Sequence, residues 1–298
     1  MNNWKFLTLL GIMLSVFLVV GCSSSKSKGQ VEISGSVSYG TGPNNTKPYP
    51  QSKPVNVNGA TGAKPIFETQ RIGGCNKNYR VLGKNYKVWN GTTSYIEEGT
   101  ASWYGPGFHG QKTSNGEIYN QKGYTAAHKN LPLPSYLLVT NLTNGKKVIV
   151  RVNDRGPFVD SRIIDLSEGS AKAIGMIGKG TAKVRIELIK VNKDGSLGNT
   201  EGSYRAASVP TVAPAPVAKT TPQTVANGWY VQLVACSSYL MASEIKRNAQ
   251  TKTSHPVVIL NNNNVNRVVV GPLDEHSARQ LADSLKSKGF PDCFVKKM

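Results

Sequence analysis

Acidic residues are scarce in this sequence. Its 298 residues include 36 Lys and Arg but only 17 Asp and Glu, which gives a formal net charge of +19 at pH 7. Such an excess favours attraction to anionic surfaces and polymers. The basic residues are spread along the whole chain and form no dense stripe of the kind that binds nucleic acid. The charge therefore indicates a broadly anionic environment and argues against a nucleic-acid partner.

Cysteine and histidine are also rare, with four of each. They lie far apart in the sequence, and none shows the paired spacing that is typical of a metal site. We therefore expect no metal and no other cofactor.

Long hydrophobic runs are missing, and hydrophobic residues make up only 39% of the chain. The uncharged apolar run at residues 6–20 is shorter than the about 20 residues that a membrane-spanning helix needs. Lys5 precedes this run and Gly21 and Cys22 follow it, a pattern typical of a signal peptide. We predict that residues 1–21 are a secretory signal, and export further argues against nucleic acid.

The small residues before Cys22 resemble the lipobox of bacterial lipoproteins. This resemblance implies that the thiol of Cys22 is acylated and that Cys22 becomes the new N-terminus, so that several acyl chains hold the protein on a membrane. Ser23 favours sorting to the outer membrane, on its inner leaflet facing the periplasm. An ordinary secretory signal with an incidental cysteine is the alternative.

Two segments have a composition that cannot bury much apolar surface. Residues 22–78 are rich in Ser, Gly, Asn, Pro and Lys and are predicted to be a flexible tether. Residues 192–227 include the Pro-rich stretch VPTVAPAP and are predicted to be a linker. Two compact regions remain, at residues 79–191 and 228–298.

The first compact region shows the alternation of β-strands. Residues 136–140 and 147–152 flank Asn144 and Gly145, a strong hairpin signal, and residues 183–189 alternate as well. Ser167 suits the N-cap of a short helix that ends at Gly175. Many short strands with one small helix predict a mainly β domain, a closed barrel.

The second compact region is predicted to be α+β with the order β-α-β-β-α-β. The strands are expected at residues 229–235, 256–260, 265–270 and 293–297, and the helices at 241–250 and 275–288. The first and last strands of this arrangement are antiparallel neighbours, which predicts a disulfide between Cys236 and Cys293 in an oxidising periplasm. Two buried free thiols are the alternative, and the pairing of Cys75 stays open.

Several motifs resemble one family, and they occur in order with short gaps. They are residues 99–105 (GTASWYG), 108–110 (FHG), 113–117 (TSNGE), 125–128 (TAAH), 153–158 (NDRGPF) and 162–167 (RIIDLS). The series closely resembles the RlpA (rare lipoprotein A) family, which implies a double-psi β-barrel over residues 79–191. Residues 230–233 (YVQL) and 267–272 (RVVVGP) resemble a SPOR domain, a small ferredoxin-like fold.

The resemblance implies a lytic transglycosylase. Such enzymes cut the bond between MurNAc and GlcNAc in peptidoglycan without water and leave a 1,6-anhydro end. The SPOR domain implies binding to glycan strands stripped of stem peptides and enrichment at the division septum. The alternatives are a non-catalytic peptidoglycan binder, as in expansin-like proteins, and a structural tether between membrane and wall.

Lytic cleavage needs one well-placed acid/base, whereas a hydrolase normally needs two carboxylates. Asp154 is the best candidate. In an extended strand it shares one face with Val148, Val150 and Val152, and desolvation on that apolar face would raise its pKa. The family's catalytic Asp also matches Asp154. A structural role in the turn that follows, or pairing with Arg155, is the alternative.

Other candidates have weaker support. His128 and Glu117 match family residues associated with activity, but His128 could simply hold its loop and Glu117 could be a solvated turn residue. Asp165 precedes Leu166 and Ser167, where we expect it to cap the helix. Trp103 and Tyr104 could stack on a sugar or fill the barrel. In the second region, we expect three residues to be exposed glycan contacts or ordinary surface: Gln232, Tyr239 and Arg267.

Overall fold

The computed structural model describes residues 53–70, 73–105, 107–158, 161–208, 226–262 and 265–298. The predicted signal peptide, Cys22 and the first half of the predicted tether therefore lie outside the described residues, as do residues 209–225 of the predicted linker, which include its Pro-rich stretch. No helix within the described ranges is long and apolar enough to cross a membrane.

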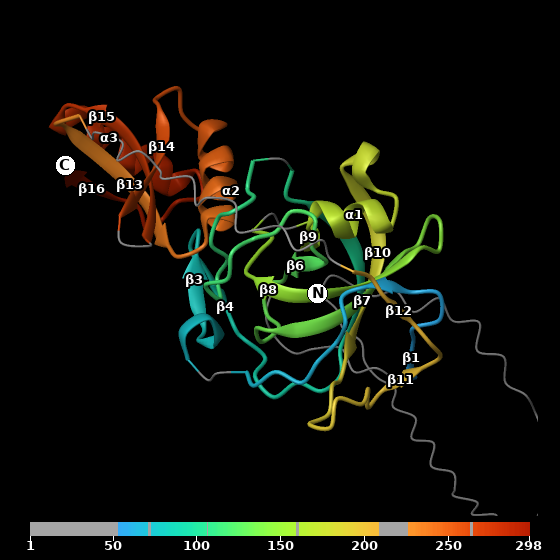
Figure 1. Cartoon of the computed structure of the whole chain (residues 1–298). Helices are drawn as coiled ribbons and strands as arrows, with labels where there is room; N and C mark the ends of the chain where they lie inside the picture. The colour runs from blue at the N-terminus through green and yellow to red at the C-terminus, as the bar shows by residue number, and fades with distance from the viewer. Residues whose placement is uncertain (1–52, 71–72, 106, 159–160, 209–225, 263–264) are drawn as a thin grey trace, which may run out of the picture. The chain divides into compact units, whose positions relative to one another are not determined.

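Six strands form a closed barrel (Figure 1). They are β5 (Ile96–Trp103), β6 (Thr125–Ala127), β7 (Ser135–Asn141), β8 (Lys147–Asp154), β9 (Arg162–Leu166) and β10 (Thr181–Ile189). Their order is β8-β6-β9-β5-β10-β7, and the pairing of β7 with β8 closes the ring. The predicted double-psi barrel class is confirmed.

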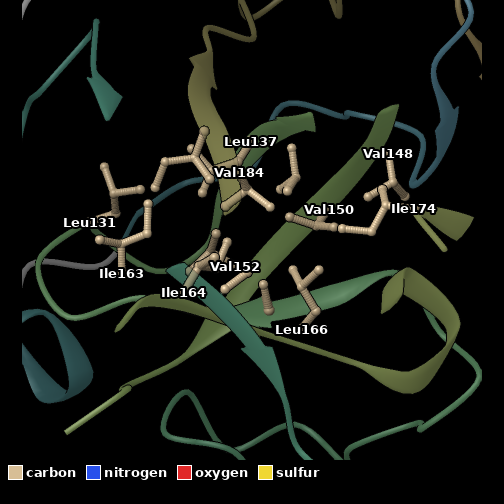
Figure 2. Close-up of a cluster of buried hydrophobic side chains, with 14 of the residues drawn as sticks. Leu131, Leu137, Val148, Val150, Val152, Ile163, Ile164, Leu166, Ile174 and Val184 are labelled. Atoms are coloured by element: carbon tan, nitrogen blue, oxygen red, sulfur yellow. The ribbon is translucent and has the colours of Figure 1, made fainter. Parts of the chain in front are cut away.

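The barrel interior is filled by aliphatic side chains (Figure 2). Val148, Val150 and Val152 of β8 alternate into it and are fully buried, together with Ile164 and Leu166 of β9. Burial of such side chains contributes about 1.5–3 kcal/mol each. This packing holds the strand ends, which carry the polar residues described below, in fixed places.

Local signals in this region are confirmed. Strands β7 and β8 form an antiparallel hairpin in which Thr140 pairs with Lys147. Helix α1 (Glu168–Ala173) begins after Ser167, whose hydroxyl accepts a hydrogen bond from the backbone N–H of Ser170. A hydroxyl at this position satisfies one of the open N–H groups of the first turn.

The tether and linker predictions are wrong at the ends nearest the barrel. Strand β2 (Thr61–Gly62) pairs in parallel with β8, β12 (Arg205–Ala206) pairs with β2, and β1 (Val55–Asn56) pairs with β11 (Thr200–Glu201). A short 3-10 helix (Gly74–Asn76) also lies within the predicted tether. Val55 and Val57 are buried against Leu138 and Ile149, on the outer side of β7 and β8. Because that side is apolar, these short segments cover it.

A separate hairpin, β3 (Tyr79–Val81) and β4 (Lys84–Tyr86), precedes the barrel strands. The rings of Tyr79 and Tyr86 stack, with centroids 5.0 Å apart. The hydroxyl of Tyr79 donates to the carbonyl of Lys129 (2.8 Å), which connects this hairpin to the loop after β6.

Residues 226–298 form an antiparallel sheet with two helices. The elements are β13 (Trp229–Cys236), α2 (Tyr239–Gln250), β14 (Val257–Asn262), β15 (Val265–Leu273), α3 (Glu275–Ser287) and β16 (Phe294–Lys297). The sheet order is β14-β15-β13-β16. Val231 and Val268 pack with Ile245 of α2 and Leu285 of α3 on one face. The predicted β-α-β-β-α-β order is confirmed.

The predicted disulfide between Cys236 and Cys293 is wrong, and both thiols are free. Strands β13 and β16 are antiparallel neighbours as expected, but Gln232 pairs with Phe294. This register leaves Cys293 three residues short of Cys236 along the sheet, about 10 Å, which is beyond disulfide reach. The Cys293 thiol instead donates to the carbonyl of Ala282 (3.4 Å).

Candidate active site

Asp154 is the last residue of β8 and is fully buried. Its Oδ1 accepts hydrogen bonds from the backbone N–H of Ser114 (2.8 Å), the hydroxyl of Ser114 (2.5 Å) and the N–H of Arg155 (2.8 Å). Burial raises the pKa of Asp154 to about 6, although these hydrogen bonds favour the charged form. The predicted desolvated carboxyl is therefore present, and its pKa suits a general acid.

The strand register places a second carboxyl in the same row of the sheet. Ala127 of β6 pairs with Asp154 on one side and with Asp165 of β9 on the other. A register shift between Ala126 and Ala127 brings Asp154 into this row, whereas Val152 pairs with Ala126. Residues opposite one another in adjacent strands face the same side, so Asp154 and Asp165 flank the small side chain of Ala127.

The expectation that Asp165 caps the helix is wrong, because Ser167 is the N-cap. Asp165 lies in β9, where its Oδ1 accepts a hydrogen bond from the Ser102 hydroxyl (2.5 Å). Nη1 of Arg162 lies 3.6 Å from the same oxygen. Burial raises the pKa of Asp165, while Arg162 and Ser102 act in the opposite direction. Sequence reasoning assigned Asp165 a capping role, although the alternation of residues 162–166 indicated a place within a strand.

Glu117 lies in an ionic network and not on Asp154. Its carboxylate accepts from both terminal nitrogens of Arg151 (2.6 and 2.7 Å), from Asn153 (2.8 Å) and from Asn115 (2.8 Å). Burial alone would raise the pKa of Glu117, but these donors outweigh it and lower the pKa. Arg151 also binds both oxygens of Glu68. Glu117 is thus an ion-paired carboxylate that holds the loop carrying Ser114 and Asn115.

The ring of His128 is buried and makes two contacts with backbone N–H groups. Nδ1 accepts from Asn130 (3.1 Å) and Leu131 (3.0 Å), which places the ring proton on Nε2, 3.2 Å from the hydroxyl of Tyr95. Burial, together with Lys129 and Arg155, holds the pKa of His128 well below its ordinary value. The ring is therefore a neutral element that fixes its own loop.

No hydrogen bond joins the His128 ring to the Asp154 carboxyl within the described residues. The connection runs through the backbone, where the N–H of His128 donates to the carbonyl oxygen of Asp154 (3.1 Å). The guanidinium of Arg155 extends the same support by donating to the carbonyl oxygens of Leu131 (2.5 Å) and Cys75 (2.7 Å). His128 is consequently placed to position Asp154 and not to exchange a proton with it.

Trp103 is the last residue of β5, and Tyr104 follows it. They are among the residues that line a small pocket, together with Arg155, Arg162 and Asp165. The hydroxyl of Tyr104 is buried and has no hydrogen-bond partner within the described ranges. Burial raises the pKa of Tyr104, and the nearby charges of Asp154 and Asp165 raise it further. Trp103 also packs against the barrel core, which agrees with the core-packing role, and stacking on a sugar stays a prediction.

The predicted contacts in the second region are only partly accessible. Gln232 is 8% exposed, so its expected exposure is wrong; it lies on β13, an inner strand of the sheet. Tyr239 begins α2 and Arg267 lies opposite Ala235, and both are half-buried. Phe294 pairs with Gln232 and is 51% exposed. This aromatic residue, which sequence reasoning missed, suits stacking on a sugar.

No cluster of metal-ligating side chains occurs in the part of the chain that the structure describes. In the barrel sheet, four residues on neighbouring strands pair in one row: Ser102, Asp165, Ala127 and Asp154. Three of them are polar, and two are carboxyls. Such a row of carboxyls with desolvation and neighbouring donors suits proton transfer to a polar substrate.

Two family models match the chain. Residues 96–186 match the family model described as "Lytic transglycolase", and residues 226–297 match the model described as "SPOR domain". The chain is thus a double-psi β-barrel protein of the lytic transglycosylase class with a C-terminal SPOR domain.

Similar proteins specify the family. The endolytic peptidoglycan transglycosylase RlpA of Vibrio cholerae is 38% identical over 285 residues, 95% of each chain. The RlpA of Pseudomonas aeruginosa strain UCBPP-PA14 is 34% identical over 94% of each chain. The RlpA of Campylobacter jejuni is 56% identical over 126 residues, 42% of this chain and 46% of the other. The chain belongs to the RlpA family, a family of endolytic peptidoglycan transglycosylases.

Proposed function

We propose that the chain is a lytic transglycosylase that cleaves the MurNAc–GlcNAc bonds of peptidoglycan and leaves 1,6-anhydroMurNAc ends. The observation that carries this proposal is the buried carboxyl of Asp154, whose pKa burial raises to about 6. A carboxylic acid with such a pKa is still partly protonated near neutral pH and can give its proton to a leaving oxygen.

One carboxyl is sufficient for the whole cycle. Protonated Asp154 donates its proton to the oxygen that bridges the two sugars, and the bond from the MurNAc anomeric carbon to that oxygen breaks. The 6-hydroxyl of the same MurNAc then attacks the anomeric carbon and gives its proton to the Asp154 carboxylate. The acid is restored, the new end is an internal ether, and no water is consumed.

The surrounding groups support this assignment. Glu117 is a poorer general acid than Asp154, because its donors lower its pKa. It holds Asn115 beside Ser114, whose hydroxyl and N–H both bind Asp154. The donors on Asp154 Oδ1 stabilise the carboxylate that forms after proton transfer, which allows the same group to act as base.

The test incubates the chain with purified sacculi and with peptide-free glycan strands, and analyses the products by mass spectrometry. We expect fragments that are lighter by one water than hydrolysis products, and their loss in Asp154→Asn. An exposed carboxylate, Asp194, offers the matched control Asp194→Asn, which should behave as the unchanged chain. Co-sedimentation with sacculi without any product would contradict the proposal and would indicate a binding protein. Fragments with ordinary reducing ends would indicate a hydrolase.

The second domain is proposed to bind glycan strands stripped of stem peptides and to enrich the protein at the division septum. The match to the SPOR model supports this proposal. The helices cover one face of the sheet, where Val231 and Val295 pack. Gln232, Phe294 and Lys296 alternate with these residues along β13 and β16 and therefore face the other side. An exposed aromatic ring beside a cationic side chain suits a sugar polymer.

We further propose a lipid anchor at Cys22 that holds the protein on the inner leaflet of the outer membrane, facing the periplasm. The apolar run at residues 6–20, the small residues before Cys22 and the serines after it support this proposal. The basic net charge is consistent with an anionic envelope.

A further inference from the structure

The carboxyl of Asp154 has a hydrogen-bond partner from the SPOR domain. Ser238, the N-cap of α2, donates its hydroxyl to Oδ2 of Asp154 (3.1 Å) and accepts the backbone N–H of Met241 in its own helix. Oδ1 of Asp154 already receives three hydrogen bonds from the barrel. Both carboxyl oxygens are therefore occupied and Asp154 is fully buried, so a glycosidic oxygen cannot reach its proton in this arrangement.

Helix α2 has two faces with different partners. Ala242 and Ile245 pack into the core of the SPOR domain. Leu240, Glu244 and Arg247 follow one another at spacings of four and three residues, which places them on one side of the helix, and all three line the pocket beside the carboxyl row of the barrel. The pocket has a volume of about 20 Å³, which is room for a water molecule but not for a sugar ring.

An ion pair holds α2 at this place. The carboxylate of Glu244 binds the guanidinium of Arg162 and accepts the backbone N–H of Phe158 (3.0 Å). The same guanidinium lies 3.6 Å from Asp165, so Arg162 serves a carboxyl of each domain. Loss of one partner from such a half-buried pair is costly, and a positive charge at residue 244 would place two cations side by side.

A second contact lies on the β3–β4 hairpin, apart from the carboxyls. Val81 and Tyr86 of this hairpin belong to the hydrophobic cluster of the SPOR domain, and Arg80 pairs with Asp292 (2.9 Å). A Cβ atom added to Gly83 would lie 3.8 Å from the Cβ atom of Pro291. This contact can therefore be locked without a change to the carboxyl row.

We propose that the SPOR domain is an internal inhibitor of the barrel: α2 occupies the place of the glycan at Asp154, and the barrel acts only after α2 has left. The inference rests on the proposed transglycosylase function. Because substrate and α2 compete for the same carboxyl, only the open fraction of the protein binds glycan, and the apparent KM rises as that fraction falls. The value of kcat is unchanged, because the occupied site is the same once α2 has left.

The closed arrangement leaves the other face of the SPOR sheet free. The helices lie on one face, and Phe294 lies on the opposite one, where it is 51% exposed. The closed protein can therefore attach to a glycan strand through this face. Attachment raises the local concentration of substrate near the barrel, which favours displacement of α2. Cleavage is thereby confined to strands on which the protein is already bound.

The first test locks the contact in the full chain, purified in detergent. Gly83→Cys combined with Pro291→Cys places two thiols at a Cβ separation that suits a disulfide. After oxidation, we expect peptide mapping to show this bond and the release of anhydro fragments from soluble peptide-free glycan to fall about 20-fold or more, with recovery after reduction. Gly83→Cys alone controls for the native cysteines and should be equally active in both redox states.

Two results of this test would overturn the inference. Thiols that stay free under oxidation would show that the SPOR domain does not rest on the hairpin. A disulfide that forms without loss of activity would show that α2 does not block Asp154. If no form of the chain gives product, the proposed function fails, and formation of the disulfide then decides the contact between the domains alone.

The second test loosens the contact at α2. Glu244→Lys places a cation beside Arg162, and we expect KM to fall about tenfold with kcat unchanged. Glu275→Lys is the matched control, because Glu275 lies on α3 and pairs with Arg279 of the same helix; both constants should stay as in the unaltered chain. An equal or higher KM in Glu244→Lys contradicts the inference. Should this variant fail to fold, the disulfide lock decides.

Discussion

At the scale of single residues, the site holds two buried carboxyls, Asp154 and Asp165, in one row of the sheet. Asp154 sits among neutral donors, and Asp165 sits beside a guanidinium. A raised pKa also affects stability. A carboxyl that is harder to ionise in the folded protein than in the unfolded chain lowers the free energy of unfolding at pH values where the carboxyl is ionised. The raised pKa that suits Asp154 to act as a general acid therefore lowers the stability of the folded protein at high pH.

We predict that Asp154→Asn makes the protein more stable at alkaline pH. The pKa of Asp154 is about 6 when folded against an ordinary value of 3.8. Protonation therefore favours the folded state: this contribution is complete below 3.8 and is lost as pH rises through about 6. The difference of 2.2 corresponds to about 3 kcal/mol, which a neutral Asn avoids.

The measurement is urea unfolding of both chains at pH 8 and pH 4. The Asn variant should be more stable at pH 8 by up to about 3 kcal/mol, with the gain disappearing at pH 4. Asp194→Asn, at an exposed site whose pKa is lowered, should show no gain at pH 8. Equal stability of the Asn variant and the unaltered chain at both pH values would mean that Asp154 is solvated and not a buried acid.

At the scale of elements, local signals were sufficient where structure depends on neighbours in sequence. The β7–β8 hairpin and the helix after Ser167 follow from turn residues and capping, which act over a few residues. The burial of Asp154 was also predictable from the apolar alternation of β8. These features belong to the chain segment itself.

Other elements depend on distant partners and could not be predicted in this way. Strands β1 and β2 contain two residues each and carry no periodicity, yet contact with the outer side of β8 orders them. The register shift at Ala127, which aligns Asp154 with Asp165, and the register of β13 on β16, which separates Cys236 from Cys293, are set by cross-strand packing. A one-residue slip changes every such neighbour.

We predict that Ile149→Ala destabilises the fold by about 2–5 kcal/mol. Ile149 is fully buried on the outer side of β8, under Val55 and Val57 from the N-terminal segment. Leu142→Ala in the turn of the same hairpin is the matched control, because Leu142 is 43% exposed, and its effect should stay below about 0.5 kcal/mol. Denaturant unfolding measures both. Equal, small effects would show that residues 53–70 do not pack on the barrel.

At the scale of the whole molecule, activity and location are assigned to different parts of the chain. The barrel holds the carboxyl row, the SPOR domain carries the exposed Phe294, and Cys22 precedes both. The barrel and the β13–β16 sheet have distinct hydrophobic clusters, and Val81, Tyr86 and Phe158 of the first region belong to the second cluster. Placement by lipid and placement by glycan should therefore be separable by mutation.

Two changes test this separation in cells that produce the chain with a periplasm-compatible fluorescent tag. Cys22→Ser removes the acceptor of the lipid, so we expect the protein to leave the outer-membrane fraction for the soluble periplasmic fraction, because a peptide segment without acyl chains has no comparable membrane affinity.

Deletion of residues 228–298 should leave membrane association intact but abolish enrichment at the septum, while the barrel still releases anhydro fragments from purified glycan. Membrane association of Cys22→Ser equal to that of the unaltered chain contradicts the lipid anchor, and septal enrichment that survives the deletion contradicts recruitment by the SPOR domain. Since each outcome concerns a different segment, a failure of one leaves the other measurable.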